Sequence, residues 1–122
     1  MISALRESDL VLMPCTPAGP DVWALSETIE TVREVQAIRA ELGAGVVVNG
    51  SSKTRLASSA VRALGELGVP LASTVGRRTA IAEAVTAGQS VTEREPKGTG
   101  AFELRALADA IEALVVEVSR VA

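Results

Sequence analysis

The stretch SDLVLMPCTPAGPDVWAL, Ser8 to Leu25, decides how the rest of this chain is interpreted. Its first part, Leu10–Met13, is short and wholly apolar, which is typical of a strand buried in a parallel sheet. A loop rich in proline and glycine follows, and an amphipathic helix is expected to begin at Asp21. Loops at the carboxyl ends of parallel strands are where α/β proteins bind ligands. The stretch therefore predicts a strand, a ligand-facing loop and a helix.

The rest of the chain continues this alternation. Further strands are expected over 45–49, which is β-branched, and over 70–75. Helices are expected over 21–42, between 52 and 68, over 79–87, and after a polar turn at 93–98. The first helix has a cap at Asp21, a stop at Gly43 and an apolar stripe of Val22, Leu25, Ile29, Val32, Val35, Ile38 and Leu42. The order β-α-β-α-β-α-α predicts an α/β fold, a three-layer Rossmann-like parallel sheet covered by helices.

Composition limits the class of protein. With 122 residues, 48% of them apolar, the chain suits a single domain over residues 1–122 with a real core. Aromatic residues make up 2%, and both Trp23 and Phe102 are expected on buried apolar stripes. No apolar run is long enough to span a membrane, and the first residues do not resemble a signal peptide. We therefore expect a cytoplasmic protein that does not enter the membrane.

The content of histidine and cysteine excludes several chemistries. With no histidine and a single cysteine, neither a metal site nor general-base catalysis by histidine is expected. The lone Cys15 cannot form an internal disulfide. It is expected to be a small buried hydrophobe rather than a reactive thiol.

Charge is distributed unevenly along the chain. The segment 51–80 has a net charge of +4, whereas the whole chain has −3, so the remainder carries −7. The basic residues of this segment are Lys53, Arg55, Arg62, Arg77 and Arg78. A basic patch on an acidic chain is a candidate surface for a phosphate backbone, and an ordinary solvated helix face is the alternative. Arg55 and Arg62 share one helical face, whereas Lys53 and Arg55 do not.

The expected sheet is small. A parallel sheet needs both faces and both edges covered, and three strands with these helices leave part of it bare. We therefore expect the chain to self-associate, or to lack strands that another segment supplies.

Three segments, in this order, carry a resemblance to a known family. They are SDLVLMPCTPAGPDVWALSETIETV, VVVNGSSKTRLASSAVRAL and VGRRTAIAEAVTAGQSVTEREPKGTGAFELRALADAI. Together they resemble the C-terminal half of the ParA family of partition ATPases, deviant Walker proteins related to MinD and Soj. The resemblance covers essentially the whole chain and implies a partial P-loop NTPase fold. It also implies plasmid or chromosome segregation with bound ATP and Mg²⁺, a dimer, non-specific DNA binding, nucleoid association and a ParB-like partner.

The motif that holds the phosphates of ATP is missing. In that family the phosphate-binding loop and the catalytic aspartates precede the segment that begins here at Ser8. No Gly-Lys-Thr or Gly-Lys-Ser occurs, and the stretches 16–20 and 96–100 do not match the motif. We therefore expect no catalytic residue and no ATP hydrolysis by this chain alone. The alternatives are part of a partition ATPase, a non-catalytic DNA- or partner-binding remnant, or a truncated product without activity.

Individual residues also match positions of the family that bind the nucleotide. The loop 14–21, which contains Pro17, matches the loop that faces the nucleotide and the dimer; a plain strand-to-helix turn is the alternative. Asn49 matches the residue that hydrogen-bonds adenine, and a turn with Gly50 is the alternative. Gly76 and Arg77 lie in the loop that borders the base. The family usually has proline at the position of Gly76, and glycine there is expected to loosen the loop.

The basic residues match the family's DNA-binding positions. Arg77 matches a position that contacts the DNA backbone. Lys53, Arg55 and Arg62 lie on or beside the helix that supplies further DNA contacts, and Arg78 is adjacent to Arg77. The resemblance thus implies two sets of residues, one that faces the nucleotide and one that contacts DNA.

Overall fold

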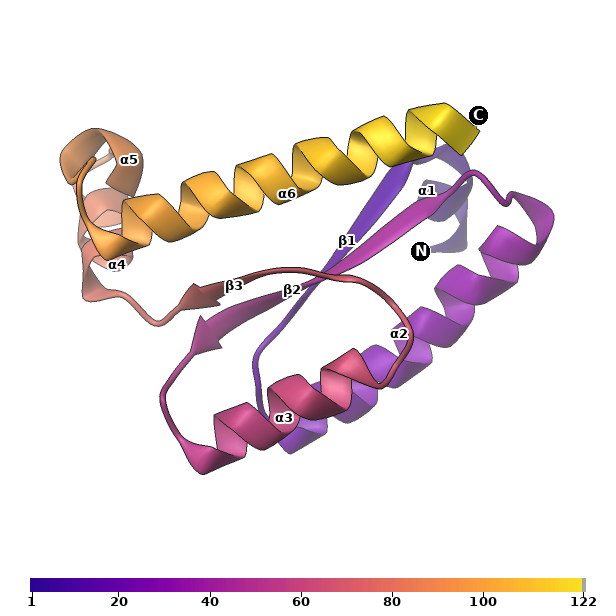
Figure 1. Ribbon diagram of the computed structural model, residues 1–122, viewed down its shortest axis with the longest axis horizontal. Coiled ribbons are helices and arrows are strands. Elements are labelled where there is room, and N and C mark those ends of the chain that lie inside the picture. Colours follow the sequence, from indigo (N-terminus) through magenta and orange to yellow (C-terminus); the bar gives the residue numbers. More distant parts are fainter. Residues whose placement is uncertain (122) are drawn as a thin grey trace.

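The computed structural model describes residues 1–121, and its strands form one parallel sheet in the order β1-β2-β3 (Figure 1). The elements in chain order are α1 (Ile2–Glu7), β1 (Leu10–Cys15), α2 (Gly19–Ile38), β2 (Gly43–Ser51), α3 (Arg55–Gly65), β3 (Leu71–Gly76), α4 (Thr79–Thr86), α5 (Val91–Arg94) and α6 (Thr99–Val121). Helices follow each strand, so the predicted α/β class and parallel sheet are confirmed.

Helices α2 and α3 cover one face of the sheet and build the core. Every second residue of the strands points to this face, including Met13, Val46 and Val48. They pack against the stripe of α2, in which Ile29 and Val32 are almost fully buried, and against Leu64 of α3. Cys15 is buried in the same cluster, as predicted.

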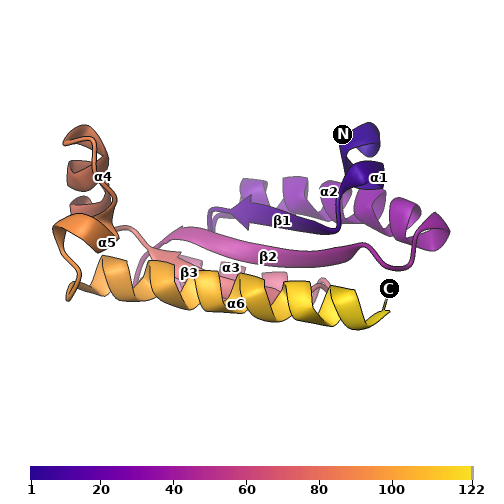
Figure 2. The same cartoon turned by 90° about the horizontal axis from the view of Figure 1, so that it is seen from above.

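Helix α6 lies alone on the other face, as the second view shows (Figure 2). It runs over β3 and continues toward the start of β1. Gly43 and Gly45 of β2 let it approach closely, because a Cβ at either position would collide with Val118 or Leu114. From 102 to 120, however, no residue of α6 is buried. The prediction that the last helix docks on the sheet is confirmed, and the cover it provides is partial.

Both predicted ends of α2 are wrong, and the residues next to each end explain why. Helix α2 begins after Ala18 rather than at Asp21, because Gly19 and Pro20 fit its first turn. It ends at Ile38, whose side chain is 81% exposed, because Arg39 leaves the helical conformation. The guanidinium of Arg39 bonds Leu5 O, Ser8 O, Asp9 and Glu41 and so joins α1 to the chain that follows α2.

The last residues of the predicted α2 helix belong to other elements of the structure. Leu42 is buried but lies in the loop, and Gly43 begins β2 instead of stopping a helix. Helices α1 and α5 lie where no helix was predicted; α5 begins with a capping box formed by Ser90 and Glu93.

The two aromatic side chains are not in the core. Trp23 is 72% exposed and Phe102 is 70% exposed, so the prediction that both are buried is wrong. Trp23 follows Val22, and adjacent residues of a helix point about 100° apart, so only Val22 faces the sheet. Among residues 1–121, no helix is both long and apolar enough to cross a membrane.

Candidate functional site

The loops at the carboxyl end of the sheet hold the residues that the sequence analysis selected. The amide of Arg77 donates to Ser51 O at 2.9 Å, which fixes the start of the β3–α4 loop against the end of β2. Asn49 pairs in register with Val75, and its side chain is exposed. Asn49, Gly76 and Arg77 therefore lie together on neighbouring strand ends. Gly50, with a φ of 72°, lies within β2 at the register shift between Asn49 and Ser51, rather than in a turn after the strand.

A basic hollow lies at the start of α3, and its cations are Lys53, Arg55 and Arg62. Hydroxyl groups of Ser52, Thr54, Ser58 and Ser59 line the same hollow. Lys53 precedes the helix and so reaches the hollow from the loop, although it does not share a helical face with Arg55. Among residues 1–121, the ion pairs involve Arg39 and Arg78 only, so these three cations are not neutralised by an acidic side chain.

The N-terminus of α3 adds to the positive potential of the basic hollow. The side chain of Thr54 caps the helix by accepting from the Ala57 amide at 3.1 Å. The other amides of the first turn point out of the helix end, where the helix dipole favours an anion. Serine hydroxyls, lysine and arginine are all donors to phosphate oxygens. The basic hollow therefore suits an extended anion such as a phosphate backbone.

Glu103 of α6 holds the β3–α4 loop. Its carboxylate accepts from Arg78 Nε at 2.7 Å and from the Gly76 amide at 3.1 Å. The hydrogen bond from Arg78, together with that from Gly76, lowers the pKa of Glu103 below its usual value, against the effect of burial. Arg78 is thus engaged in an ion pair, whereas the exposed Arg77 is not.

The bonds of Glu103 to Arg78 and to the Gly76 amide, together named the clasp, give Gly76 a specific role. Proline at this position has no N–H and would lose the bond to Glu103. A Cβ at this position would also lie 2.9 Å from Arg78 Nε. The expectation that glycine loosens this loop stays a prediction; the structure shows in addition that Glu103 of α6 bonds the loop through the Gly76 amide and Arg78. No local pattern in the sequence connects these residues, which are 25 or more positions apart.

The loop between β1 and α2 does not fit the phosphates of ATP. Pro17 and Pro20 have no N–H to donate, and the Ala18 amide already bonds Thr16 O at 2.8 Å. Pro17 is itself buried, and Pro14 lies within β1 rather than in the loop. Within residues 1–121, no group of three or more acidic, histidine or cysteine side chains could hold a metal ion. Among the described residues, the two prolines and the engaged Ala18 amide thus leave fewer N–H donors for a phosphate at the start of α2.

Cys15 ends β1 beside this loop, and its side chain is buried. Burial, and to a lesser extent the nearby Asp21 carboxylate, raises the pKa of its thiol. A raised pKa disfavours the thiolate, which is the reactive form. The prediction of an unreactive buried cysteine agrees with this environment.

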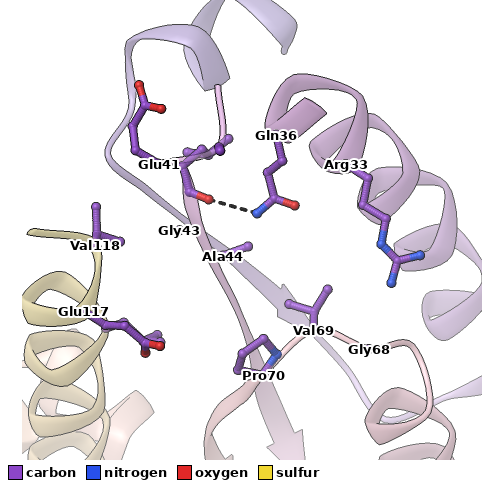
Figure 3. Close-up of a pocket in the computed structure, with 13 residues that line it drawn as sticks. Arg33, Gln36, Glu41, Gly43, Ala44, Gly68, Val69, Pro70, Glu117 and Val118 are labelled. Carbon is purple, nitrogen blue, oxygen red and sulfur yellow. Dashed lines mark hydrogen bonds between the residues drawn. The ribbon is translucent and has the colours of Figure 1, made fainter. Parts of the chain in front are cut away.

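A second hollow lies at the opposite, amino-terminal end of the sheet (Figure 3). Gln36 Nε2 donates to Leu42 O at 2.9 Å, and Arg33 bonds Leu67 O at 2.5 Å. The side chains of Arg33, Glu41 and Glu117 come from different walls and point in different directions (Figure 3). Glu41 is paired with Arg39. These groups do not converge on one point, so the hollow lacks the arrangement of a ligand site.

The chain was compared with known proteins. No family model matches it. It is 32% identical over 114 residues to the maintenance of carboxysome distribution protein A of Halothiobacillus neapolitanus, covering 92% of this chain and 50% of that protein. Its fold is similar to the cell division ATPase MinD of Pyrococcus furiosus, with a TM-score of 0.67 and 23% identity over 93% of this chain. It is also similar to apo McdA of Cyanthece, with a TM-score of 0.73 and 18% identity over 89% of this chain.

The similarity extends over nearly all of this chain but only part of each relative. The chain spans about half the length of the curated relative, and 46% of each solved structure. The resemblance to ParA- and MinD-type proteins that the three segments indicated is thereby confirmed, and so is the partial fold that it implied.

Proposed function

We propose that this chain, which is of the ParA/MinD type and spans about half of such a protein, binds the phosphate backbone of DNA within a partition or positioning system. The observation that carries the proposal is the basic hollow, with Lys53, Arg55 and Arg62 around one helix N-terminus and no acidic partner among the described residues. Arg77 is exposed, and its amide bonds Ser51 O, next to Ser52 of the basic hollow.

The character of these groups favours binding without sequence preference. Cations and hydroxyls around a helix end contact phosphates, which carry no sequence information. Such binding weakens steeply with salt because each neutralised phosphate releases counterions. Arg78 contributes less to this surface than the sequence suggested, because Glu103 holds it.

The proposal excludes ATP hydrolysis by this chain alone. Pro17 and Pro20 have no N–H to donate to a phosphate near the start of α2, and it is the resemblance that assigns Asn49 and Gly76 to the border of a base. ATP, Mg²⁺ and a ParB-like partner would then act through a P-loop part that these 122 residues do not contain. In that setting the protein works in the cytoplasm on the nucleoid.

A second candidate function differs in the object that is moved or positioned. The relative from Halothiobacillus neapolitanus is named for maintaining carboxysome distribution. That name favours the distribution of carboxysomes over the segregation of a plasmid or chromosome as the function of this chain. Both functions use the same DNA-binding surface, so the surface is the part to test first.

The test is DNA binding by fluorescence anisotropy across a salt series, with a short duplex of random sequence. For Arg55→Ala with Arg62→Ala, we expect weaker binding and a salt slope that is less negative by about 1 for each lost phosphate contact. The matched control is Arg94→Ala with Arg120→Ala, which removes two exposed arginines from other helices. Equal binding by both double variants would refute the assignment of the basic hollow.

A further inference from the structure

The loop between β3 and α4 carries two adjacent arginines that point in different directions. The amide of Arg77 is fixed by its bond to Ser51 O, and its side chain is exposed. Arg78 has extended backbone dihedrals, with a φ of −117° and a ψ of 120°. Neighbouring side chains leave an extended chain on different sides. The guanidinium of Arg78 therefore meets Glu103 of α6, whereas Arg77 faces solvent.

Glu103 uses both of its carboxylate oxygens on this loop. Oε1 accepts from Arg78 Nε at 2.7 Å, and Oε2 accepts from the Gly76 amide at 3.1 Å. The side chain of Glu103 is 16% exposed, so water and salt screen its charge less than at an open surface. The residues on either side of Arg77 are thus tied to α6, and the side chain of Arg77 is left outside the clasp.

The start of α6 is fixed by close packing. Ala101 is fully buried, and Gly100 lies so near α4 and α5 that a Cβ there would be 3.2 Å from Ile81 Cγ1 and 3.5 Å from Val91 Cγ2. The end of β3 and the starts of α4 and α6 lie at the same end of the molecule (Figure 1). The packed backbone therefore determines where the carboxylate of Glu103 is placed.

The clasp reduces the positive charge that this loop offers to an anion. The segment 51–80 contains five basic residues, and among residues 1–121 Arg78 is the only one of the five with an acidic partner. A phosphate that approaches Arg78 also meets the negative charge of Glu103, which opposes the contact. The loop thus presents one arginine to an anion, although its sequence contains two.

We propose that Glu103 is a positioning residue for the DNA-binding surface, which keeps Arg78 from the phosphate backbone and leaves Arg77 as the contact of this loop. The inference rests on the proposed function and adds to it a residue of α6 that limits the number of phosphate contacts. Glu103 acts through Arg78 and does not itself touch DNA. Loss of its charge should therefore strengthen DNA binding, whereas loss of a merely structural contact would weaken it or leave it unchanged.

The experiment measures binding of the full 122-residue chain to a short duplex of random sequence, by fluorescence anisotropy across a salt series. For Glu103→Gln we expect tighter binding and a salt slope more negative by about 1, because Arg78 becomes a further phosphate contact. Glu103→Gln with Arg78→Ala should return the slope to that of the wild type. The matched control is Glu83→Gln, which removes the same charge from an exposed position on α4 and should leave the slope unchanged.

A second series leaves Glu103 in place and so does not depend on the folding of the Glu103→Gln variant. Arg77→Ala should make the salt slope less negative by about 1, and Arg78→Ala should change it by less than half as much. Equal effects of the two changes would overturn the inference, because the clasp would then not distinguish the two arginines.

Two further results would overturn it. One is a slope for Glu103→Gln that is no more negative than that of the wild type. The other is a gain in binding that persists when Arg78 is replaced by alanine, since the gain would then come from the lost charge alone. If the wild-type chain does not bind the duplex, the proposed function fails and the inference fails with it. Binding by the wild type together with any of these contrary results refutes only the role of Glu103.

Discussion

The two faces of the sheet differ in how completely they are covered. On the face of α2 and α3, strand residues such as Val46 and Val48 are at most 1% exposed. On the face of α6, the helix itself has no buried residue between 102 and 120. The first face is a closed core, whereas the second face is covered only in part. The contrast indicates that stability comes mainly from the first face.

The largest expected effect tests the first face. Ile29 is 2% exposed at the centre of the core, so Ile29→Ala should lower the free energy of unfolding by about 2–5 kcal/mol. The matched change on the other face, Ile111→Ala, removes the same atoms from a partly exposed position and should cost less than about half as much. Urea denaturation followed by circular dichroism measures both. Equal losses would mean that the α6 face is as well packed as the other.

A smaller effect tests how closely α6 approaches the sheet. In Gly45→Ala the new Cβ would lie 2.9 Å from Leu114 Cδ1, with Leu12 and Ala72 also near. We expect a loss of about 1–3 kcal/mol, because the helix or its side chain must shift. The control is Gly65→Ala at the end of α3, where nothing lies within 4 Å; it should stabilise by roughly 0.5–1 kcal/mol. If Gly45→Ala is neutral in denaturation, α6 rests on the sheet more loosely than the structure places it.

The sequence could predict features that depend on local patterns, but not those that depend on contacts between distant residues. The apolar spacing located the α2 stripe from Val22 to Val35, because periodic burial against a sheet is a local pattern. The spacing continued to Ile38 and Leu42, but Arg39 ends the helix through contacts with α1, some thirty residues earlier. Such contacts are set by tertiary structure and leave no local pattern.

In the candidate site, too, the sequence could identify some residues and not others. Charge clustering selected Lys53, Arg55 and Arg62, and the resemblance to the family selected Asn49 and Arg77; the structure brings the first three to one hollow and the other two to neighbouring strand ends. The clasp formed by Glu103 could not be identified in this way, because an isolated glutamate in a helix has no feature that identifies a distant partner. The exposure of Trp23 was also missed, since residue type predicts burial only on average.

The smallest expected effect concerns this clasp, which joins the α6 face to the candidate site. The pKa of Glu103 is lowered in the folded chain, chiefly by the hydrogen bond from Arg78. Its contribution to stability is therefore present above the ordinary carboxyl value of 4.5 and is lost as the pH falls through the lowered folded pKa. Glu103→Gln should lower the melting temperature slightly at pH 7, and the difference from wild type should vanish in acid. Glu112→Gln, an exposed change on the same helix, should show no such convergence. Parallel melting curves for wild type and Glu103→Gln at all pH values would mean that the clasp does not hold α6, and that the helix is kept on its open face by apolar contacts alone.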